Sequence, residues 1–241
     1  MYTFGSMFAG IGGFDLGFER AGFNCVWQIE IDEFCRKVLQ KNWPNVYRWD
    51  DVTTFNPDGR DVDVLVAGFP CQDISSAGKK EGLDGKRSGL FFEVIRVARH
   101  IKPKAIVLEN VSAMLNRTMG EVLGSLAGIG YDSQWHSIQA LQFGAPHRRK
   151  RVFIIATLAD SNCERGCGRH TERENAENAW ESPRCEKSRF WHTEPSVGRV
   201  ANGVPRRVDR LRSLGNAVVP QVAESIANLT ISILNNQKCS I

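Results

Sequence analysis

Two kinds of segment alternate along residues 3–157. Short apolar runs that suit β-strands are followed by longer segments in which apolar positions recur at helical spacing. The expected strands cover residues 3–8, 25–29, 62–67, 105–108, 133–141 and 151–157, and the expected helices cover residues 14–21, 32–41, 90–100 and 118–126. Asp32 is placed to cap the second helix. This alternation predicts βαβ units and a doubly wound, mostly parallel α/β sheet.

The pattern is lost after Thr157 and returns near the C-terminus. Residues 159–212 hold 11 Lys or Arg and 9 Asp or Glu without sustained periodicity, which predicts a small irregular lobe. We expect regular structure to return at Gly215, followed by a helix over residues 219–234. The expected organisation is therefore a main domain over residues 1–157, a small lobe over 158–212 and a segment over 213–241 that returns to the main domain.

Composition narrows the class of protein. The 241 residues are 42% hydrophobic and 24% charged, as in ordinary soluble globular domains, and no apolar stretch approaches the length of a membrane span. The formal charge of +4 permits a polyanionic partner without requiring one. The N-terminal residues show no export signal and the seven cysteines are odd in number, so we expect reduced thiols and a cytoplasmic location. One of these cysteines could then act as a nucleophile.

Unusual residues follow the expected strands, which is where ligands bind in a doubly wound sheet. They are the glycine turn 10–13, Glu30, Asp51, Cys71 and Glu109. Gly10 and Gly12 begin a nicotinamide fingerprint, but its third glycine would fall on Asp15, which weakens a dehydrogenase interpretation. Glu30 stands at the tip of the second strand, where a carboxylate that binds ribose hydroxyls belongs.

Cys71 is the strongest candidate nucleophile. It follows Gly68-Phe69-Pro70, so a buried strand leads into a rigid turn that presents a thiol at the ligand edge; the alternative is a small buried side chain, as most free cysteines are. Glu109 would end the neighbouring strand and could serve as an acid partner. In the run 147–151, Arg149 and Arg151 would point to the same side of an extended chain and could line the site; the alternative is a solvated charged turn.

Five motifs, taken in order, resemble those of the DNA (cytosine-5)-methyltransferases. They are Phe8-Ala9-Gly10-Ile11-Gly12-Gly13-Phe14, Gly68-Phe69-Pro70-Cys71-Gln72, Glu109-Asn110-Val111, Arg149-Lys150-Arg151 and Gly215-Asn216-Ala217-Val218-Val219-Pro220. The resemblance covers roughly residues 3–157 and 213–235. It implies a Rossmann-like, S-adenosylmethionine-dependent methyltransferase with a small target-recognition lobe. It also implies double-stranded DNA as substrate, action as a monomer, and association with the nucleoid in a prokaryotic host.

The resemblance implies an S-adenosyl-L-methionine site built from the strand ends. Glu30 would bind the ribose hydroxyls, with Ile31 beside the adenine, and Asp51 of the Asp51-Val52-Thr53 segment would meet the adenine amino group. The remaining implied cofactor contacts are the loop residues Phe8, Gly10, Ile11, Gly12 and Gly13, and the pocket residues Val52, Pro70, Leu90, Asn216 and Ala217.

The resemblance also implies catalytic roles. The target cytosine would be flipped out of the duplex, and the Cys71 thiolate would add to its C6. Glu109 would hold a proton against N3 and should have a pKa raised by partial desolvation. Arg149, with Arg151 beside it, would neutralise O2. The loop residues Gln72, Ser75 and Arg87 would fill or clamp the gap left by the base.

The chain departs from the family pattern in three places. His147 stands where the family usually has Gln at the head of its Gln-x-Arg-x-Arg motif, so only Arg149 and Arg151 keep their roles. The helix-forming motif that usually precedes Gly215-Asn216 is not recognisable in residues 196–213. The lobe is short, which predicts a short recognition sequence read in the major groove; its candidate arginines are Arg165, Arg184, Arg189 and Arg199.

Two other functions compete with DNA methylation. A tRNA cytosine-5 methyltransferase typically carries Pro-Pro-Cys-Gln and a Cys-Phe-Thr element, neither of which occurs in this chain. A catalytically silent DNA-binding module would have no reason to keep Cys71, Glu109 and Arg149 together. The resemblance is compatible with a restriction-modification system, although no residue points to a particular restriction endonuclease.

A metal site in the lobe is a weaker hypothesis. Its four ligands would come from Cys163, Cys167, His170, Cys185 and His192. Structural zinc sites usually show tighter pairing, such as C-x2-C. We therefore expect no metal, and these residues are more simply explained as unrelated polar-loop positions.

Overall fold

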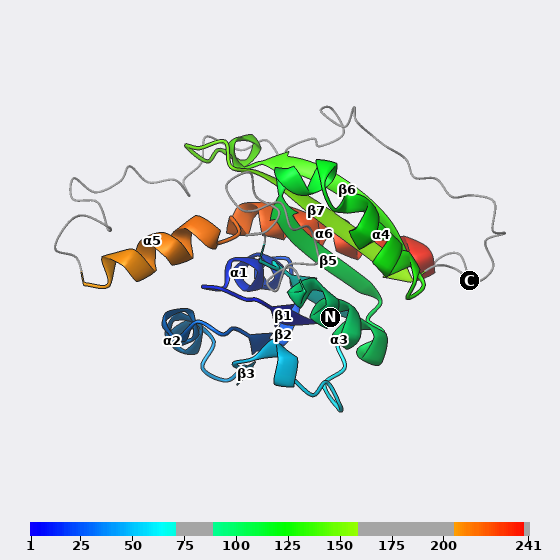
Figure 1. Cartoon of the computed structure of the whole chain (residues 1–241), viewed down its shortest axis with the longest axis horizontal. Helices are drawn as coiled ribbons and strands as arrows, with labels where there is room; N and C mark the ends of the chain where they lie inside the picture. The colour runs from blue at the N-terminus through cyan, green and yellow to red at the C-terminus, as the bar shows by residue number, and fades with distance from the viewer. Residues whose placement is uncertain (71–88, 159–204, 239–241) are drawn as a thin grey trace.

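The computed structural model describes residues 1–70, 89–158 and 205–238, and it contains the expected doubly wound sheet (Figure 1). Seven strands lie in the order β3-β2-β1-β4-β5-β7-β6. Their bounds are β1 Thr3–Met7, β2 Asn24–Ile29, β3 Tyr47–Trp49, β4 Val64–Ala67, β5 Ala105–Val111, β6 Tyr131–Gln139 and β7 Lys150–Leu158. Strands β1 to β5 pair in parallel, whereas β7 is antiparallel to both β5 and β6. The mostly parallel α/β prediction is confirmed.

The direction of winding reverses between β1 and β4. Strands β2 and β3 continue the sheet on one side of β1, and β4 and β5 continue it on the other. A reversal of this kind leaves a crevice beyond the carboxyl ends of the two central strands, where doubly wound proteins bind ligands. The fold therefore fixes where the site must be before any side chain is considered.

Helices cover both faces of the sheet. The helices are α1 Gly13–Arg20, α2 Glu33–Asn42, α3 Leu90–Ile101, α4 Met119–Ala127, α5 Arg207–Asn216 and α6 Pro220–Lys238, with short 3-10 helices η1 Val52–Thr54, η3 Ser112–Asn116 and η4 Ala140–Phe143. One core cluster joins the sheet to α3 and α4, and the other joins it to α1 and α6. In β4, Leu65 and Ala67 belong to the first cluster, and Val64 and Val66 to the second. This two-sided burial explains the continuous apolar run.

Helix α6 is apolar over much of its length because it belongs to the core. The stretch 207–236 is long and apolar enough to pass a length-and-composition test for a membrane span. However, Val222, Ala223, Ile226 and Ala227 are buried in the cluster that α6 shares with α1. The core helices of soluble proteins pass the same test.

Three parts of the described fold differ from the expectation. The edge strand β3 was not foreseen, because it is only three residues long and none of them is fully buried. Strand β5 continues past Leu108, because Glu109 pairs with Phe153 of β7; Glu109 is thus within the strand, not beyond it. Helix α5 begins at Arg207, inside the range expected to be irregular until Gly215.

Candidate active site

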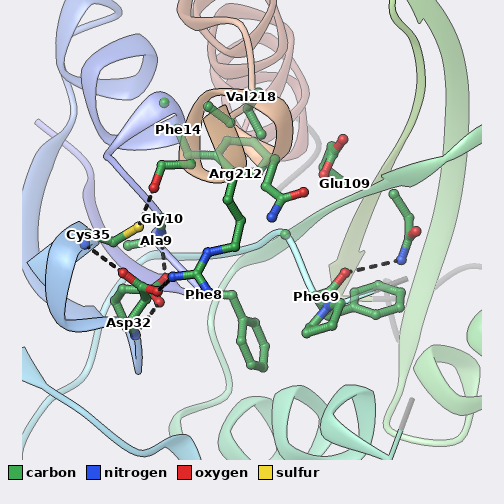
Figure 2. Close-up of a pocket in the computed structure, with 18 of the residues that line it drawn as sticks. Phe8, Ala9, Gly10, Phe14, Asp32, Cys35, Phe69, Glu109, Arg212 and Val218 are labelled. Atoms are coloured by element: carbon green, nitrogen blue, oxygen red, sulfur yellow. Dashed lines mark hydrogen bonds and ion pairs between the residues drawn. The ribbon is translucent and has the colours of Figure 1, made fainter. Parts of the chain in front are cut away.

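A cavity of about 250 Å³ opens at the carboxyl ends of β1, β4 and β5 (Figure 2). Ten residues predicted for the site line it: Phe8, Gly10, Gly13, Glu30, Ile31, Pro70, Glu109, Arg151, Asn216 and Ala217. They come from the two stretches of chain that carry the motifs, which the fold brings together. The cavity is also lined by residues that were not predicted for the site, among them Asp32, Cys35, Arg212 and Ser213.

The glycine loop between β1 and α1 is shaped by close contacts that a side chain would obstruct. Gly12, the N-cap of α1, has a φ of 88°, and a Cβ there would lie 2.4 Å from Cζ3 of Trp43. A Cβ on Gly13 would lie 2.3 Å from the carbonyl oxygen of Val218. These distances are far inside van der Waals contact, so the two glycines let α1 approach both α2 and the α5–α6 junction. Ile11 and Gly12 belong to this loop but do not line the described cavity.

Glu30 ties the glycine loop to the start of α2. Its Oε2 accepts a hydrogen bond of 2.7 Å from the backbone N–H of Gly10, and its Oε1 accepts one of 2.7 Å from the backbone N–H of Asp32. Burial raises the pKa of Glu30, although the two backbone donors oppose the shift. Each carboxylate oxygen has a second lone pair. Glu30 could therefore accept further hydrogen bonds from hydroxyl groups in the cavity.

The residues predicted to meet the adenine are only partly at the cavity. Ile31 is 72% exposed and lies on the wall, as an apolar surface for a flat ring requires. Asp51 caps η1, and its Oδ1 accepts from the backbone N–H (2.9 Å) and the hydroxyl (2.8 Å) of Thr53. Val52 is buried in the core, and neither it, Asp51 nor Leu90 lines the described cavity. Their contact with an adenine stays a prediction.

Glu109 is a buried carboxyl group with one cationic neighbour at hydrogen-bond distance. Glu109 is 8% exposed, and its Oε1 lies 3.0 Å from Nε of Arg151. Burial raises its pKa from 4.5 to about 7, in spite of the opposing charges of Arg151 and Arg149. The expected upward shift is confirmed. A group with this pKa is half protonated near neutrality, which suits it to general acid catalysis.

The turn that leads to Cys71 is held against this carboxyl group. A Cβ on Gly68 would lie 3.5 Å from Oε2 of Glu109, so the turn passes close to the acid. The side chain of Asn110 donates a hydrogen bond of 3.4 Å to the carbonyl oxygen of Phe69. Phe69 and Pro70 both line the cavity. The chain therefore enters residues 71–88 from the cavity wall, beside Glu109.

Arg149 and Arg151 do different things in the structure. Arg149 precedes β7 with a φ of 25°, and its guanidinium donates hydrogen bonds of 2.7 Å to the carbonyl oxygens of Gly215 and Ala217. Arg151 is the arginine whose side chain pairs with Glu109. The predicted contact of Arg149 with O2 stays a prediction, and these hydrogen bonds of its side chain go to the end of α5. Its turn geometry aims the side chain in that direction.

Several predicted residues lie outside the described part of the chain. These are Cys71, Gln72, Ser75 and Arg87, the lobe arginines Arg165, Arg184, Arg189 and Arg199, and the metal candidates Cys163, Cys167, His170, Cys185 and His192. Within residues 1–70, 89–158 and 205–238, no group of three or more His, Cys, Asp or Glu side chains could hold a metal ion.

Comparison with known proteins agrees with this geometry. The family of C-5 cytosine-specific DNA methylases matches residues 2–204. The chain is 40% identical over 161 residues to type II methyltransferase M2.BsuMI of Bacillus subtilis (strain 168), covering 64% of this chain and 41% of that protein. It is 40% identical over 168 residues to type II methyltransferase M.Eco47II of Escherichia coli, covering 66% and 40%. The chain thus spans less than half the length of these curated relatives.

The fold also matches a solved structure. The crystal structure of S. pombe Dnmt2 methyltransferase aligns with a TM-score of 0.56 at 22% sequence identity, covering 66% of this chain and 51% of that one. At this identity the match concerns the fold alone. The match supports the doubly wound α/β fold independently of the motifs.

Proposed function

Because the chain belongs to the C-5 cytosine-specific DNA methylase family, we propose that it transfers a methyl group from S-adenosyl-L-methionine to C5 of a cytosine in duplex DNA. One observation carries this proposal most directly. The family's glycine loop and its buried acid, Glu109, line one cavity, and Pro70 brings the chain to the same cavity immediately before Cys71.

The described residues suit the proposed cofactor. Glu30 offers carboxylate lone pairs beside the loop, and Ile31 offers an exposed apolar face. A Cβ on Gly10 would meet no atom within 4 Å, so a ligand can approach the backbone closely there. Asn216 and Ala217 close the cavity from the α5–α6 junction. When bound, S-adenosyl-L-methionine supplies an electrophilic methyl group on a sulfonium. The chain's own task is to make C5 of cytosine nucleophilic.

Cys71 and Glu109 would accomplish this together. The target base must leave the duplex stack, because C6 is not accessible to in-line attack inside it. The sulfur of the Cys71 thiolate forms a bond to C6, which breaks the C5–C6 double bond and pushes electron density toward C5 and N3. Glu109, protonated, donates a hydrogen bond or its proton to N3 and so stabilises that density. After methylation, loss of the C5 proton restores the double bond and expels the thiolate.

Arg151 would neutralise the oxygen of the same base. Its guanidinium has five N–H donors, of which the contact with Glu109 uses one and a hydrogen bond of 3.0 Å to the carbonyl oxygen of Lys150 uses another. The remaining donors could face O2, which lies next to N3 on the pyrimidine ring. Fixed charge of this kind, aimed at the atom where negative charge develops, is usually a large catalytic contribution. We therefore assign to Arg151 the role that the family resemblance alone would give to Arg149.

Methyl transfer with a labelled cofactor tests the proposal. Purified chain is incubated with methyl-labelled S-adenosyl-L-methionine and either unmethylated genomic duplex DNA or tRNA, and the product is digested to nucleosides. We expect label in 5-methyldeoxycytidine and none in the RNA. Label in RNA alone would favour the tRNA enzyme, and no label in either, with cofactor and DNA both bound, would favour a silent DNA-binding module.

A further inference from the structure

Helix α5 forms one wall of the cavity but buries few apolar side chains against the described part of the fold. Ser213 is its only buried residue. Its apolar side chains Val208, Leu211 and Leu214 are 73%, 42% and 57% exposed in the described part of the chain. An element with so few buried apolar contacts belongs to the least stable part of a fold, because burial provides most of the stabilisation. Polar contacts must therefore hold α5 in place.

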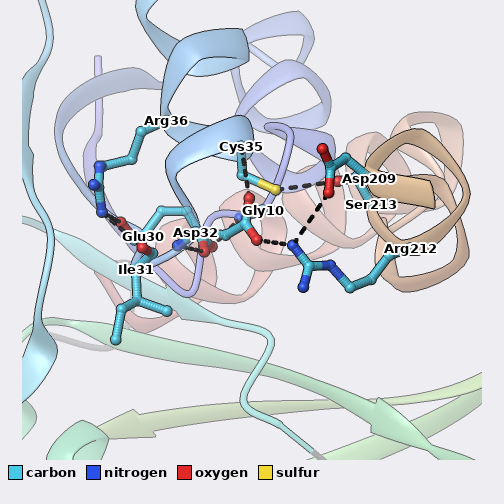
Figure 3. Close-up of polar contacts among 9 residues, drawn as sticks. All are labelled: Gly10, Glu30, Ile31, Asp32, Cys35, Arg36, Asp209, Arg212 and Ser213. Atoms are coloured by element: carbon cyan, nitrogen blue, oxygen red, sulfur yellow. Dashed lines mark hydrogen bonds and ion pairs between the residues drawn. The ribbon is translucent and has the colours of Figure 1, made fainter. Parts of the chain in front are cut away.

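Two of these polar contacts reach across to the start of α2, as Figure 3 shows. The guanidinium of Arg212 forms an ion pair with the carboxylate of Asp32. One residue further along α5, the hydroxyl of Ser213 lies 3.3 Å from the sulfur of Cys35. Asp32 is the N-cap of α2, and its other oxygen accepts from the backbone N–H of Cys35 at 3.0 Å. The contacts therefore attach α5 to the capped N-terminus of α2.

The same contacts are coupled to the candidate cofactor site. Asp32, Cys35, Arg212 and Ser213 all line the cavity. The backbone N–H of Asp32 donates to Glu30, the predicted ribose ligand. The cavity has a volume of about 250 Å³, and α5 forms one of its walls. A movement of α5 away from α2 would therefore open the cavity on that side.

We propose that Asp32, Cys35, Arg212 and Ser213 form a latch, which fastens α5 to α2 over the cofactor pocket and must open for cofactor exchange. This inference rests on the proposed function only for the identity of the ligand. Arg212 acts in it as a positioning residue: it holds the wall formed by Asn216 and Ala217 against the bound ligand. Opening costs the ion pair and the Ser213–Cys35 contact, and binding of the cofactor favours the closed arrangement.

Cys35 provides a direct measure of latch opening. Its side chain is buried, and burial raises the pKa of the thiol to about 11, so it should react slowly with an alkylating reagent while the latch is closed. Alkylation by N-ethylmaleimide is followed by peptide mass spectrometry, with and without S-adenosylhomocysteine. Cys25, which is equally buried but lies in the core beside Asp15, reports global unfolding in the same sample.

Matched variants separate the ion pair from the rest of the helix. Arg212→Ala should speed Cys35 alkylation by up to about fivefold, the upper limit for a partly exposed ion pair, and weaken S-adenosylhomocysteine binding by a similar factor or less. Arg212→Lys should restore much of both. Asp32→Asn keeps the N-cap but removes the charge, so it should match Arg212→Ala and add nothing to it in the double variant. Arg210→Ala changes the same helix at a residue that bonds Pro205 instead, and should have no effect.

A kinetic measurement distinguishes positioning from general structural support. In methyl-transfer assays, Arg212→Ala should raise KM for the cofactor and leave kcat at saturating cofactor within about twofold. Unchanged alkylation of Cys35 in both Arg212→Ala and Asp32→Asn would overturn the latch, as would parallel acceleration of Cys25. A wild-type chain that binds no S-adenosylhomocysteine would refute the proposed function instead, while the alkylation rates without ligand still decide whether the latch exists.

Discussion

Nε of Arg151 in strand β7 lies 3.0 Å from Oε1 of Glu109 in strand β5. These two strands are neighbours in the sheet and pair antiparallel. The pairing register places Arg151 opposite Val111 and Glu109 opposite Phe153. The two side chains thus meet diagonally at the edge of the cavity. This pair brings an acid with a pKa of about 7 together with a permanent cation where the cytosine ring is proposed to sit.

The acid should be indispensable for turnover but not for binding. Glu109→Gln keeps the shape and a hydrogen-bond donor but delivers no proton, so single-turnover methylation should fall by roughly 10²–10⁴-fold. Binding of S-adenosyl-L-methionine should be unchanged, and so should flipping, followed by fluorescence of 2-aminopurine at the target position. Methylation within about threefold of wild type would make Glu109 a structural carboxylate.

The pKa of Glu109 also predicts a pH profile. Only the protonated form can donate, so the single-turnover rate should decline as the pH rises through about 7. Glu109→Gln has no proton to lose at this position, and its residual rate should lack this decline. A wild-type rate that stays level to pH 9 would show that Glu109 is not the acid.

Substitutions of Arg149 and of Arg151 should change different kinetic constants. Arg149→Lys keeps the charge but cannot bridge the carbonyl oxygens of Gly215 and Ala217, so it should raise KM for the cofactor and change kcat little. Arg151→Lys disturbs the group beside Glu109 and should lower kcat instead. Steady-state kinetics with cofactor and DNA varied in turn measures both constants. The opposite pattern would return the O2 role to Arg149.

Much of this site could be predicted from the sequence, because its main parts are local. The end of β4 is visible in the sequence as an apolar run followed by Gly68-Phe69-Pro70. The end of β1 is likewise marked by the glycines that follow it, and Glu30 lies where its strand stops. The hydrogen bonds of Arg149 could not be predicted, because its partners, Gly215 and Ala217, are more than sixty positions away. Helix α5 was missed for a related reason. Its surface is polar and only Ser213 is buried, so it leaves no apolar periodicity to detect.

A second buried acid should make the stability of the fold depend on pH. Asp15 is fully buried; it accepts from Gln28 at 2.7 Å and from Ser6 at 3.1 Å, and burial raises its pKa from 3.8 to about 6. The folded state therefore favours the protonated form. The contribution of Asp15 to the free energy of unfolding is greatest below pH 4 and is lost as the pH rises toward and past 6, by at most ~3 kcal/mol.

Asp15→Asn tests this by removing the titration while keeping an acceptor for Gln28. Urea unfolding of both proteins at several pH values gives the difference between their free energies of unfolding. Other groups, Glu109 included, titrate in both proteins and cancel in this difference. We expect the variant to gain stability relative to wild type between pH 4 and pH 7. A difference that stays constant over this range would contradict the prediction.

The residues that recognise the DNA sequence should lie in the lobe over residues 158–212. Direct readout requires side chains in the major groove, and the described sheet edge is occupied by cofactor and catalytic residues. Replacing residues 159–204 by the corresponding segment of a related enzyme should move the methylated site, as read by bisulfite sequencing of genomic DNA. A folded, active chimaera with an unchanged site would place recognition elsewhere.

The central claim is that Cys71 forms a transient bond to C6 of the cytosine, and a trapped adduct tests it most directly. Duplex DNA synthesised with 5-fluorocytosine lacks the C5 proton whose loss releases the enzyme, so the adduct should accumulate when S-adenosyl-L-methionine is present. Peptide mass spectrometry should then find the modified nucleotide on Cys71 and on none of the other six cysteines. Cys71→Ser should form no adduct, since a hydroxyl is a poor nucleophile at neutral pH. An adduct on another cysteine, or unimpeded turnover on fluorinated DNA, would contradict the mechanism.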